Sequence, residues 1–143
     1  MRVLVTGSAD GLGHAAAEEL QRAGHEVVVH VRNGDRLHTV SALVAAGAQV
    51  VVGDLAERDQ VMSMADQVNA IGRMDAVIHN AGVGDGPSVL PVNVVAPYVL
   101  TASLQRRLEV DTLESTLGQA RIAMTVELGV GLPRVRMVPA AQK

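Results

Sequence analysis

The segment Thr6-Gly7-Ser8-Ala9-Asp10-Gly11-Leu12-Gly13 joins a short apolar run to an amphipathic stretch. Gly7 allows a tight turn out of a strand, Gly11 has no Cβ to keep the backbone from a pyrophosphate, and Gly13 allows a helix to pack closely on a sheet. The helix that follows would direct its free N–H groups and positive dipole end at phosphate oxygens. The alternative is an ordinary glycine turn in a flavodoxin-like fold without a cofactor.

On either side of this turn, the first 104 residues alternate between two patterns. Short runs rich in β-branched residues are typical of buried parallel strands and occupy residues 2–6, 26–31, 49–52 and 75–79. Amphipathic stretches that each end at a glycine predict helices over residues 12–23, 35–46 and 56–71. A fourth helix is expected over residues 92–108, where Pro97 should kink it or define its start.

This alternation predicts an α/β fold, a Rossmann-type doubly wound parallel sheet with helices on both faces. Its ligand site should lie at the carboxyl ends of the strands, at the switch point of the sheet. Residues 1–104 form the expected nucleotide-binding part, and residues 105–143 a divergent segment. In that segment, residues 105–118 could extend the fourth helix and residues 121–128 could form a fifth strand. We therefore expect an incomplete sheet.

The composition argues against several kinds of site. The chain of 143 residues has no Cys, Phe or Trp, one Tyr and a formal net charge of −3. Without cysteine there are no disulfides, thiol catalysis or zinc fingers, and the five histidines show no metal-binding pattern. The acidic charge and scarce aromatics disfavour nucleic-acid binding. No run reaches the roughly 18 apolar residues of a membrane span, and we expect a cytoplasmic protein.

Four motifs in order resemble the short-chain dehydrogenase/reductase family over about residues 1–104. They are Thr6, Gly7, Gly11 and Gly13 of the first turn, Asp54-Leu55 after the third strand, Asn80-Ala81-Gly82 after the fourth strand, and Asn93 in the fourth helix. The resemblance implies hydride transfer between a nicotinamide cofactor and an alcohol/carbonyl pair of unknown identity. It assigns adenine contacts to Asp54-Leu55 and a catalytic role to Asn93. Asp54 could simply cap the third helix, a role that can coexist with the adenine contact, and the Asn-Ala-Gly segment could be only a turn.

The end of the second strand, Val31-Arg32-Asn33, bears on the choice of cofactor. It lacks the acidic residue with which an NAD site binds the ribose 2′-hydroxyl. Arg32 could bind a 2′-phosphate bidentately, although it could also be a solvated surface residue. We therefore expect NADP(H) to be preferred over NAD(H). The expected cofactor-binding residues are Gly7, Ser8, Asp10, Gly11, Leu12, Gly13, Arg32, Asn33, Asp54, Leu55, Asn80, Ala81 and Gly82.

The chain departs from the family in its catalytic residues. The family uses a serine after the fifth strand and a Tyr-x3-Lys pair, in which the lysine lowers the tyrosine pKa from about 10. Here the one tyrosine is Tyr98, the one lysine is Lys143, and Glu127 and Leu128 stand near the expected serine position. Asn93 alone carries over from the catalytic set.

Three hypotheses follow from this departure. The chain could be a truncated or frame-shifted member with weak or no activity, or a non-catalytic NADP-binding sensor or interaction module. It could also be an enzyme that uses other residues, such as His79, Asp85, Tyr98 or Glu127. A response-regulator receiver is disfavoured, because the first strand does not end in clustered Asp residues. An incomplete sheet leaves apolar surface uncovered, so we expect a homo-oligomer or a partner-dependent fold.

Overall fold

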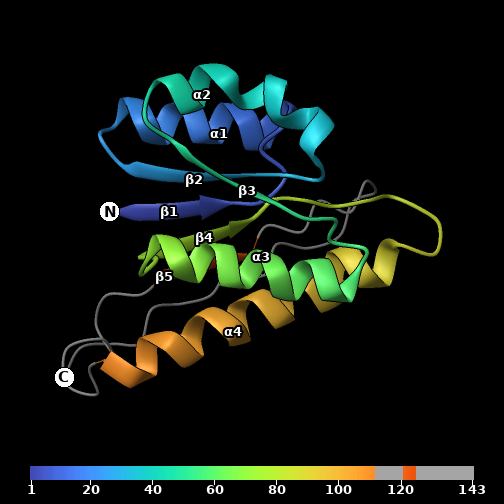
Figure 1. Ribbon diagram of the computed structural model, residues 1–143. Helices are drawn as coiled ribbons and strands as arrows, with labels where there is room; N and C mark the ends of the chain where they lie inside the picture. Colours follow the sequence, from blue (N-terminus) through green and yellow to red (C-terminus); the bar gives the residue numbers. More distant parts are fainter. Residues whose placement is uncertain (112–120, 125–143) are drawn as a thin grey trace.

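One parallel sheet organises the fold in the computed structural model, which describes residues 1–111 and 121–124, with side chains through residue 104 (Figure 1). Its strands are β1 Arg2–Val5, β2 Glu26–Val31, β3 Gln49–Val52, β4 Ala76–His79 and β5 Arg121–Met124. Their order is β3-β2-β1-β4-β5, and every neighbouring pair runs parallel. The predicted α/β sheet is therefore confirmed.

Helices cover both faces of this sheet. They are α1 Gly11–Arg22, α2 Ser41–Ala45, α3 Arg58–Ile71 and α4 Ala96–Asp111, with a 3-10 helix η1 at Gly34–Val40 and a π-helical turn η2 at Pro91–Val95. Figure 1 shows α1 and α2 on one face of the sheet and α3 and α4 on the other. In the described part of the chain, no helix combines the length and the hydropathy needed to cross a membrane.

The core consists of two apolar layers, because successive side chains of a strand point to opposite faces of the sheet. Leu4 of β1 is fully buried in one layer, together with Met64 of α3 and Leu100 of α4. The next residue, Val5, is fully buried in the other layer with Ala17 of α1. Burying each large aliphatic side chain stabilises the fold by about 1.5–3 kcal/mol. The strand ends are thereby held in fixed positions.

The prediction of one helix over residues 35–46 was wrong, because η1 precedes a short α2 there. Two hydroxyl groups bond to backbone carbonyls three residues earlier: Thr39 Oγ1 donates to Arg36 at 2.8 Å, and Ser41 Oγ donates to His38 at 2.9 Å. Such local bonds compete with regular α-helical ones, and tighter 3-10 turns accommodate them. The glycine at position 47 still ends the segment, with a φ of 101°.

The fourth helix begins at Ala96, so Pro97 lies at its start and follows the π-helical turn η2. The Ala96 N–H donates to the Pro91 carbonyl, five residues earlier. Pro97 has no N–H with which to bond the Asn93 carbonyl, and a wider turn suits this gap. The helix reaches Asp111, and β5 covers the first four residues of the expected fifth strand. The remaining expected positions there, including Glu127 and Leu128, lie outside the described residues.

Candidate functional site

A cleft of about 530 Å³ opens at the carboxyl ends of the strands, a usual volume for a small-molecule site. Its walls are the first turn, the end of β2, the segments after β3 and β4, and the start of η2. β1 lies between β2 and β4. The strands that follow β1 in sequence are therefore added first on one side of it, as β2 and β3, and then on the other side, as β4 and β5. The cleft thus lies at the predicted switch point.

Two positions of the first turn must be glycine, because neighbouring atoms lie too close for a side chain. Gly7 has a φ of 69°, and a Cβ there would lie 2.9 Å from the Ala81 Cα. A Cβ at Gly13 would overlap both the Gly7 carbonyl oxygen and Asn80 Nδ2. Gly11 differs, because its Cβ would meet nothing within 4 Å and its backbone faces open space. The close packing predicted for Gly13 is therefore confirmed.

The segment after β4 is bonded directly to the first turn. Thr6 Oγ1 accepts the backbone N–H groups of Asn80 at 3.0 Å and Ala81 at 3.1 Å. Asn80 Nδ2 in turn donates to the carbonyls of Thr6 at 3.1 Å and Gly7 at 3.2 Å. Thr6 and Asn80 are thus brought together from motifs that are more than 70 residues apart.

His30 and Ser8 fix the other side of the turn. His30 is 3 % exposed and bonds the Gly7 N–H through Nδ1 and the Gly53 carbonyl through Nε2. Ser8 Oγ is fully buried, donates to the Val5 carbonyl and accepts from the His30 backbone N–H. The Ser8 hydroxyl therefore supports the turn from inside and does not line the cleft.

Two arginines line the described cleft, and each faces a carboxylate. Arg32 Nε lies 3.8 Å from Asp54 Oδ2, and Arg36 Nη2 lies 2.5 Å from Asp10 Oδ2. Asp10 occupies the N-cap position of α1, but its side chain makes no capping hydrogen bond. The first N–H groups of α1 are therefore left without a side-chain cap beside the cleft.

Asp54 does not cap α3, whose N-cap residue is Glu57. Its Oδ1 instead accepts a hydrogen bond of 2.9 Å from the backbone N–H of Ala56, two residues later, and this bond closes an Asx-turn. Its backbone N–H donates to Gln60 Oε1 at 2.8 Å. The alternative role of Asp54 as the cap of the third helix is therefore wrong, because its carboxylate is used before the helix begins. Asp54 and Leu55 both line the cleft.

Asn93 lies in η2, buried and directed at the loop after β4. Its Oδ1 accepts the Val83 N–H and its Nδ2 donates to the Val83 carbonyl, both at 2.9 Å. Val83 lines the cleft, whereas Asn93 does not. In the structure, Asn93 therefore acts as a clamp on the cleft wall.

Most expected cofactor residues gather around the cleft. Those that line it are Gly7, Asp10, Gly11, Leu12, Arg32, Asp54, Leu55, Asn80, Ala81 and Gly82. Ser8 and Gly13 lie behind the turn, and Asn33 is an exposed residue at the start of η1. Sequence reasoning missed His30 and Arg36 as cleft residues. The arginine four residues after Arg32 was a visible signal, but its approach to Asp10 needs the tertiary fold.

Comparison with known proteins gives the family. The family model for short chain dehydrogenases matches residues 1–106. The chain belongs to the short-chain dehydrogenase family. The resemblance drawn from the four motifs is therefore confirmed.

Individual relatives of this chain support the same conclusion. An uncharacterized oxidoreductase of Emericella nidulans is 38% identical over 118 residues, which are 74% of this chain and 46% of the relative. The crystal structure of a metagenomic short-chain oxidoreductase with NADP has a TM-score of 0.65 at 30% identity and covers 77% of this chain and 57% of its own. The RhlG/NADP complex of Pseudomonas aeruginosa has a TM-score of 0.73 at 25% identity, with coverages of 86% and 53%.

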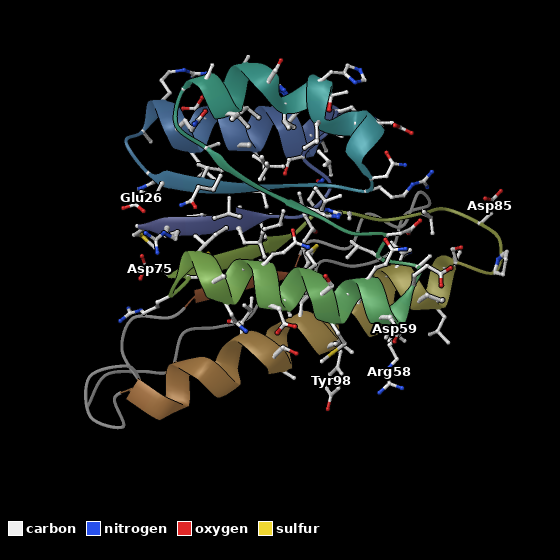
Figure 2. All side chains as sticks on the ribbon, in the orientation of Figure 1. Glu26, Arg58, Asp59, Asp75, Asp85 and Tyr98 are labelled. Carbon is white, nitrogen blue, oxygen red and sulfur yellow. The ribbon has the colours of Figure 1, made fainter. Side chains whose placement is uncertain are left out.

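The chain spans less than half the length of the first curated relatives that it matches. Its sequence contains no Tyr-x3-Lys pair. Among the described residues, the alternative catalytic candidates are also not gathered: His79 is buried and bonds Thr101 at 3.0 Å. Asp85 lies on the loop before η2, and Tyr98 projects from α4, 75% exposed (Figure 2). Among the residues whose side chains are described, no group of three metal-ligand side chains occurs.

Proposed function

We propose that this chain binds NADP(H) in the cleft, in preference to NAD(H). The observation that carries this proposal is the meeting of two arginines with the uncapped start of α1 at the switch point. Backbone N–H groups at a helix start bind phosphate oxygens, and a guanidinium group suits a 2′-phosphate. The open space in front of Gly11 leaves that backbone accessible.

The cleft walls suggest one orientation of the dinucleotide. The pyrophosphate would lie against Gly11 and Leu12, the 2′-phosphate at Arg32, and the adenine beside Asp54-Leu55. Asn80-Ala81-Gly82 would adjoin the nicotinamide ribose, where small side chains leave room. The bound nicotinamide would supply or accept a hydride. The related solved structures with NADP support this assignment of cofactor class.

The reaction we propose for the complete catalytic unit is hydride transfer between NADP(H) and an alcohol/carbonyl substrate of unknown identity. For the chain itself we propose weak or no turnover, since it has no Tyr-x3-Lys pair. An unassisted tyrosine, with a pKa near 10, is a poor proton donor and acceptor at neutral pH.

A second candidate is a non-catalytic NADP(H) sensor or interaction module. It is favoured by the combination of a formed cleft with the missing catalytic pair. The two candidates differ in one measurement. Oxidation of NADPH with a panel of aldehydes and ketones, followed at 340 nm, should show slow turnover for a weakened enzyme and none for a sensor.

The binding proposal is tested by calorimetric titration with NADPH and then with NADH. The native chain should bind NADPH more tightly, and Arg32→Asp should weaken NADPH binding more than NADH binding, because a carboxylate repels a 2′-phosphate. Arg58→Gln is the control, since Arg58 projects from the start of α3 outside the cleft (Figure 2). Equal losses for the two cofactors would contradict the role of Arg32. No binding to a folded chain would contradict the proposed function.

We also infer a homo-oligomer or an association with a partner subunit, in the cytoplasm. Large apolar side chains are exposed just before η2, on η2 and on α4, among them Leu90 at 62%, Val94 at 56% and Tyr98 at 75%. Covering exposed apolar side chains is favourable. Light scattering should show self-association that Val94→Glu reduces, whereas Leu37→Glu on η1 should not reduce it. A monodisperse monomer would contradict self-association.

A further inference from the structure

Asp10 and Arg36 form an ion pair on the wall of the cleft, between the first turn and η1. Their side chains are 78% and 43% exposed, so solvent and ligands can reach both. Aspartate at an N-cap usually accepts a backbone N–H of the following helix. The Asp10 carboxylate makes no such bond and reaches Arg36 instead. This ion pair bridges two segments that are 26 residues apart in sequence.

The second arginine of the described cleft is held less closely. Arg32 Nε lies 3.8 Å from Asp54 Oδ2, beyond hydrogen-bond distance, and its side chain is 68% exposed. Asp54 is also engaged with the Ala56 N–H. A phosphate that enters the cleft would therefore find the Arg32 guanidinium without a close hydrogen-bond partner among the described residues, whereas Arg36 is already bonded to a carboxylate.

We propose that Asp10 and Arg36 form an exchangeable clasp that sets the preference between NADP(H) and NAD(H), an inference that rests on the proposed cofactor site. The 2′-phosphate, which lies beside Arg32, takes the place of the Asp10 carboxylate at Arg36 as well. A phosphate group carries more negative charge than a carboxylate and offers three acceptor oxygens, so it can displace the carboxylate. The 2′-hydroxyl of NAD(H) has no charge and leaves the clasp closed.

The clasp gives Asp10 and Arg36 opposite effects on one ligand. Arg36 attracts the 2′-phosphate, whereas Asp10 competes for Arg36 and repels the phosphate. Removing Asp10 should therefore improve NADP(H) binding, and this result distinguishes the clasp from a structural ion pair. A structural pair would respond in the same direction to the loss of either partner, and equally for both cofactors.

The test is a calorimetric titration of the whole chain with NADPH and with NADH at fixed ionic strength. Asp10→Asn should tighten NADPH binding roughly two- to fivefold, the effect expected of an exposed ion pair. Arg36→Gln should weaken NADPH binding about tenfold, because a charge-assisted bond to phosphate is lost. NADH affinity should stay within about twofold in both variants. In the Arg36→Gln background, Asp10→Asn should give a smaller gain, which measures the coupling.

A matched control exists on the same helix. Glu19 and Arg22 form an ion pair near the end of α1, where both side chains are exposed. Neither lines the cleft. Glu19→Gln and Arg22→Gln remove the same charges and should leave both affinities unchanged. Adenosine 2′,5′-bisphosphate, which carries the 2′-phosphate without nicotinamide, should show the same dependence on Asp10 and Arg36.

The outcomes separate the clasp from the cofactor site. If the native chain prefers NADPH but Asp10→Asn and Arg36→Gln leave the ratio of the two affinities unchanged, the clasp is wrong and the cofactor site stands. Equal changes for NADPH and NADH would assign the pair a purely structural role and overturn the clasp. If a folded native chain binds neither dinucleotide, the cofactor site and the clasp are both wrong.

Discussion

Gly7 donates its backbone N–H to Nδ1 of His30 over 3.0 Å, and this bond ties the first turn to the end of β2. On the other side of the ring, Nε2 lies 2.7 Å from the Gly53 carbonyl after β3. Because Nδ1 accepts, the proton of the neutral ring belongs on Nε2. Burial lowers the pKa of His30, against smaller raising effects from the Gly53 carbonyl and the Asp54 charge. One neutral side chain thus links three strand ends around the cleft.

His30→Leu should reduce both stability and cofactor binding. The leucine leaves the Gly7 N–H and the Gly53 carbonyl without this partner, at a cost of about 2–4 kcal/mol in the free energy of unfolding. The displaced turn should also bind NADPH less tightly. Urea denaturation and calorimetric titration measure the two effects, with the exposed His38→Gln as control. A loss of stability no greater than that of the control would show that this bond is dispensable.

Stability should fall in mild acid because of His79. Burial lowers the pKa of His79 to about 4, and among the described residues its Nδ1 has no hydrogen-bond partner. An unperturbed histidine, as in an unfolded chain, has a pKa of about 6.5, so between these two values the unfolded state binds more protons. The stabilising effect of the neutral ring is complete above pH 6.5 and is lost as the pH falls toward 4. We expect a loss of about 2 kcal/mol between pH 7 and pH 5.

His79→Leu should remove this part of the pH dependence. Urea unfolding at pH 7 and pH 5 would show a smaller loss of stability for the variant than for the native chain. His30 contributes with the same sign in both proteins, because its pKa is also lowered, so their difference isolates His79. His38→Gln should follow the native chain. Parallel curves for the native chain and His79→Leu would contradict the prediction.

Gly13→Ala should be strongly destabilising, since its Cβ would overlap the Gly7 carbonyl and Asn80. Forcing these groups apart should cost at least about 2 kcal/mol and weaken NADPH binding. Gly34→Ala adds the same methyl group where nothing lies within 4 Å, and it should change stability by less than about 0.5 kcal/mol. Denaturation of the two variants side by side measures the difference. Similar stabilities would show that the first turn can shift freely.

Asn93→Ala should loosen the cleft wall at Val83. The substitution removes two hydrogen bonds of 2.9 Å from a buried amide and should destabilise the chain by about 2 kcal/mol. Asn93→Asp keeps the acceptor for the Val83 N–H but cannot donate to its carbonyl when ionised, so it should not restore stability. Denaturation and NADPH titration check both variants, with Asn69→Ala on α3 as control. If Asn93→Ala has the stability and the NADPH affinity of the native chain, the hydrogen bonds from Asn93 to Val83 do not hold the cleft wall.

The parts of the site that the sequence predicted depend on backbone requirements that are local. The backbone roles predicted for Gly7 and Gly13 are confirmed, because a turn between a strand and a helix needs a positive φ and a missing Cβ wherever it occurs. The four strands of the first 104 residues followed from apolar runs in the same way. The prediction of a single helix over residues 35–46 was wrong, because the side-chain hydroxyls of Thr39 and Ser41 form hydrogen bonds that compete with the regular α-helical ones.

By itself, the sequence determined the α/β fold, the position of the cleft and its glycine turn, since these follow from local periodicity and chain connectivity. Only the tertiary structure decided how side chains from distant segments are used. Ser8 is directed inward, Asn93 clamps Val83, and Asp10 reaches Arg36 and leaves α1 uncapped. These pairings depend on side-chain directions and on distances across the sheet. No local pattern encodes such distances, because they are set by the packing of whole layers.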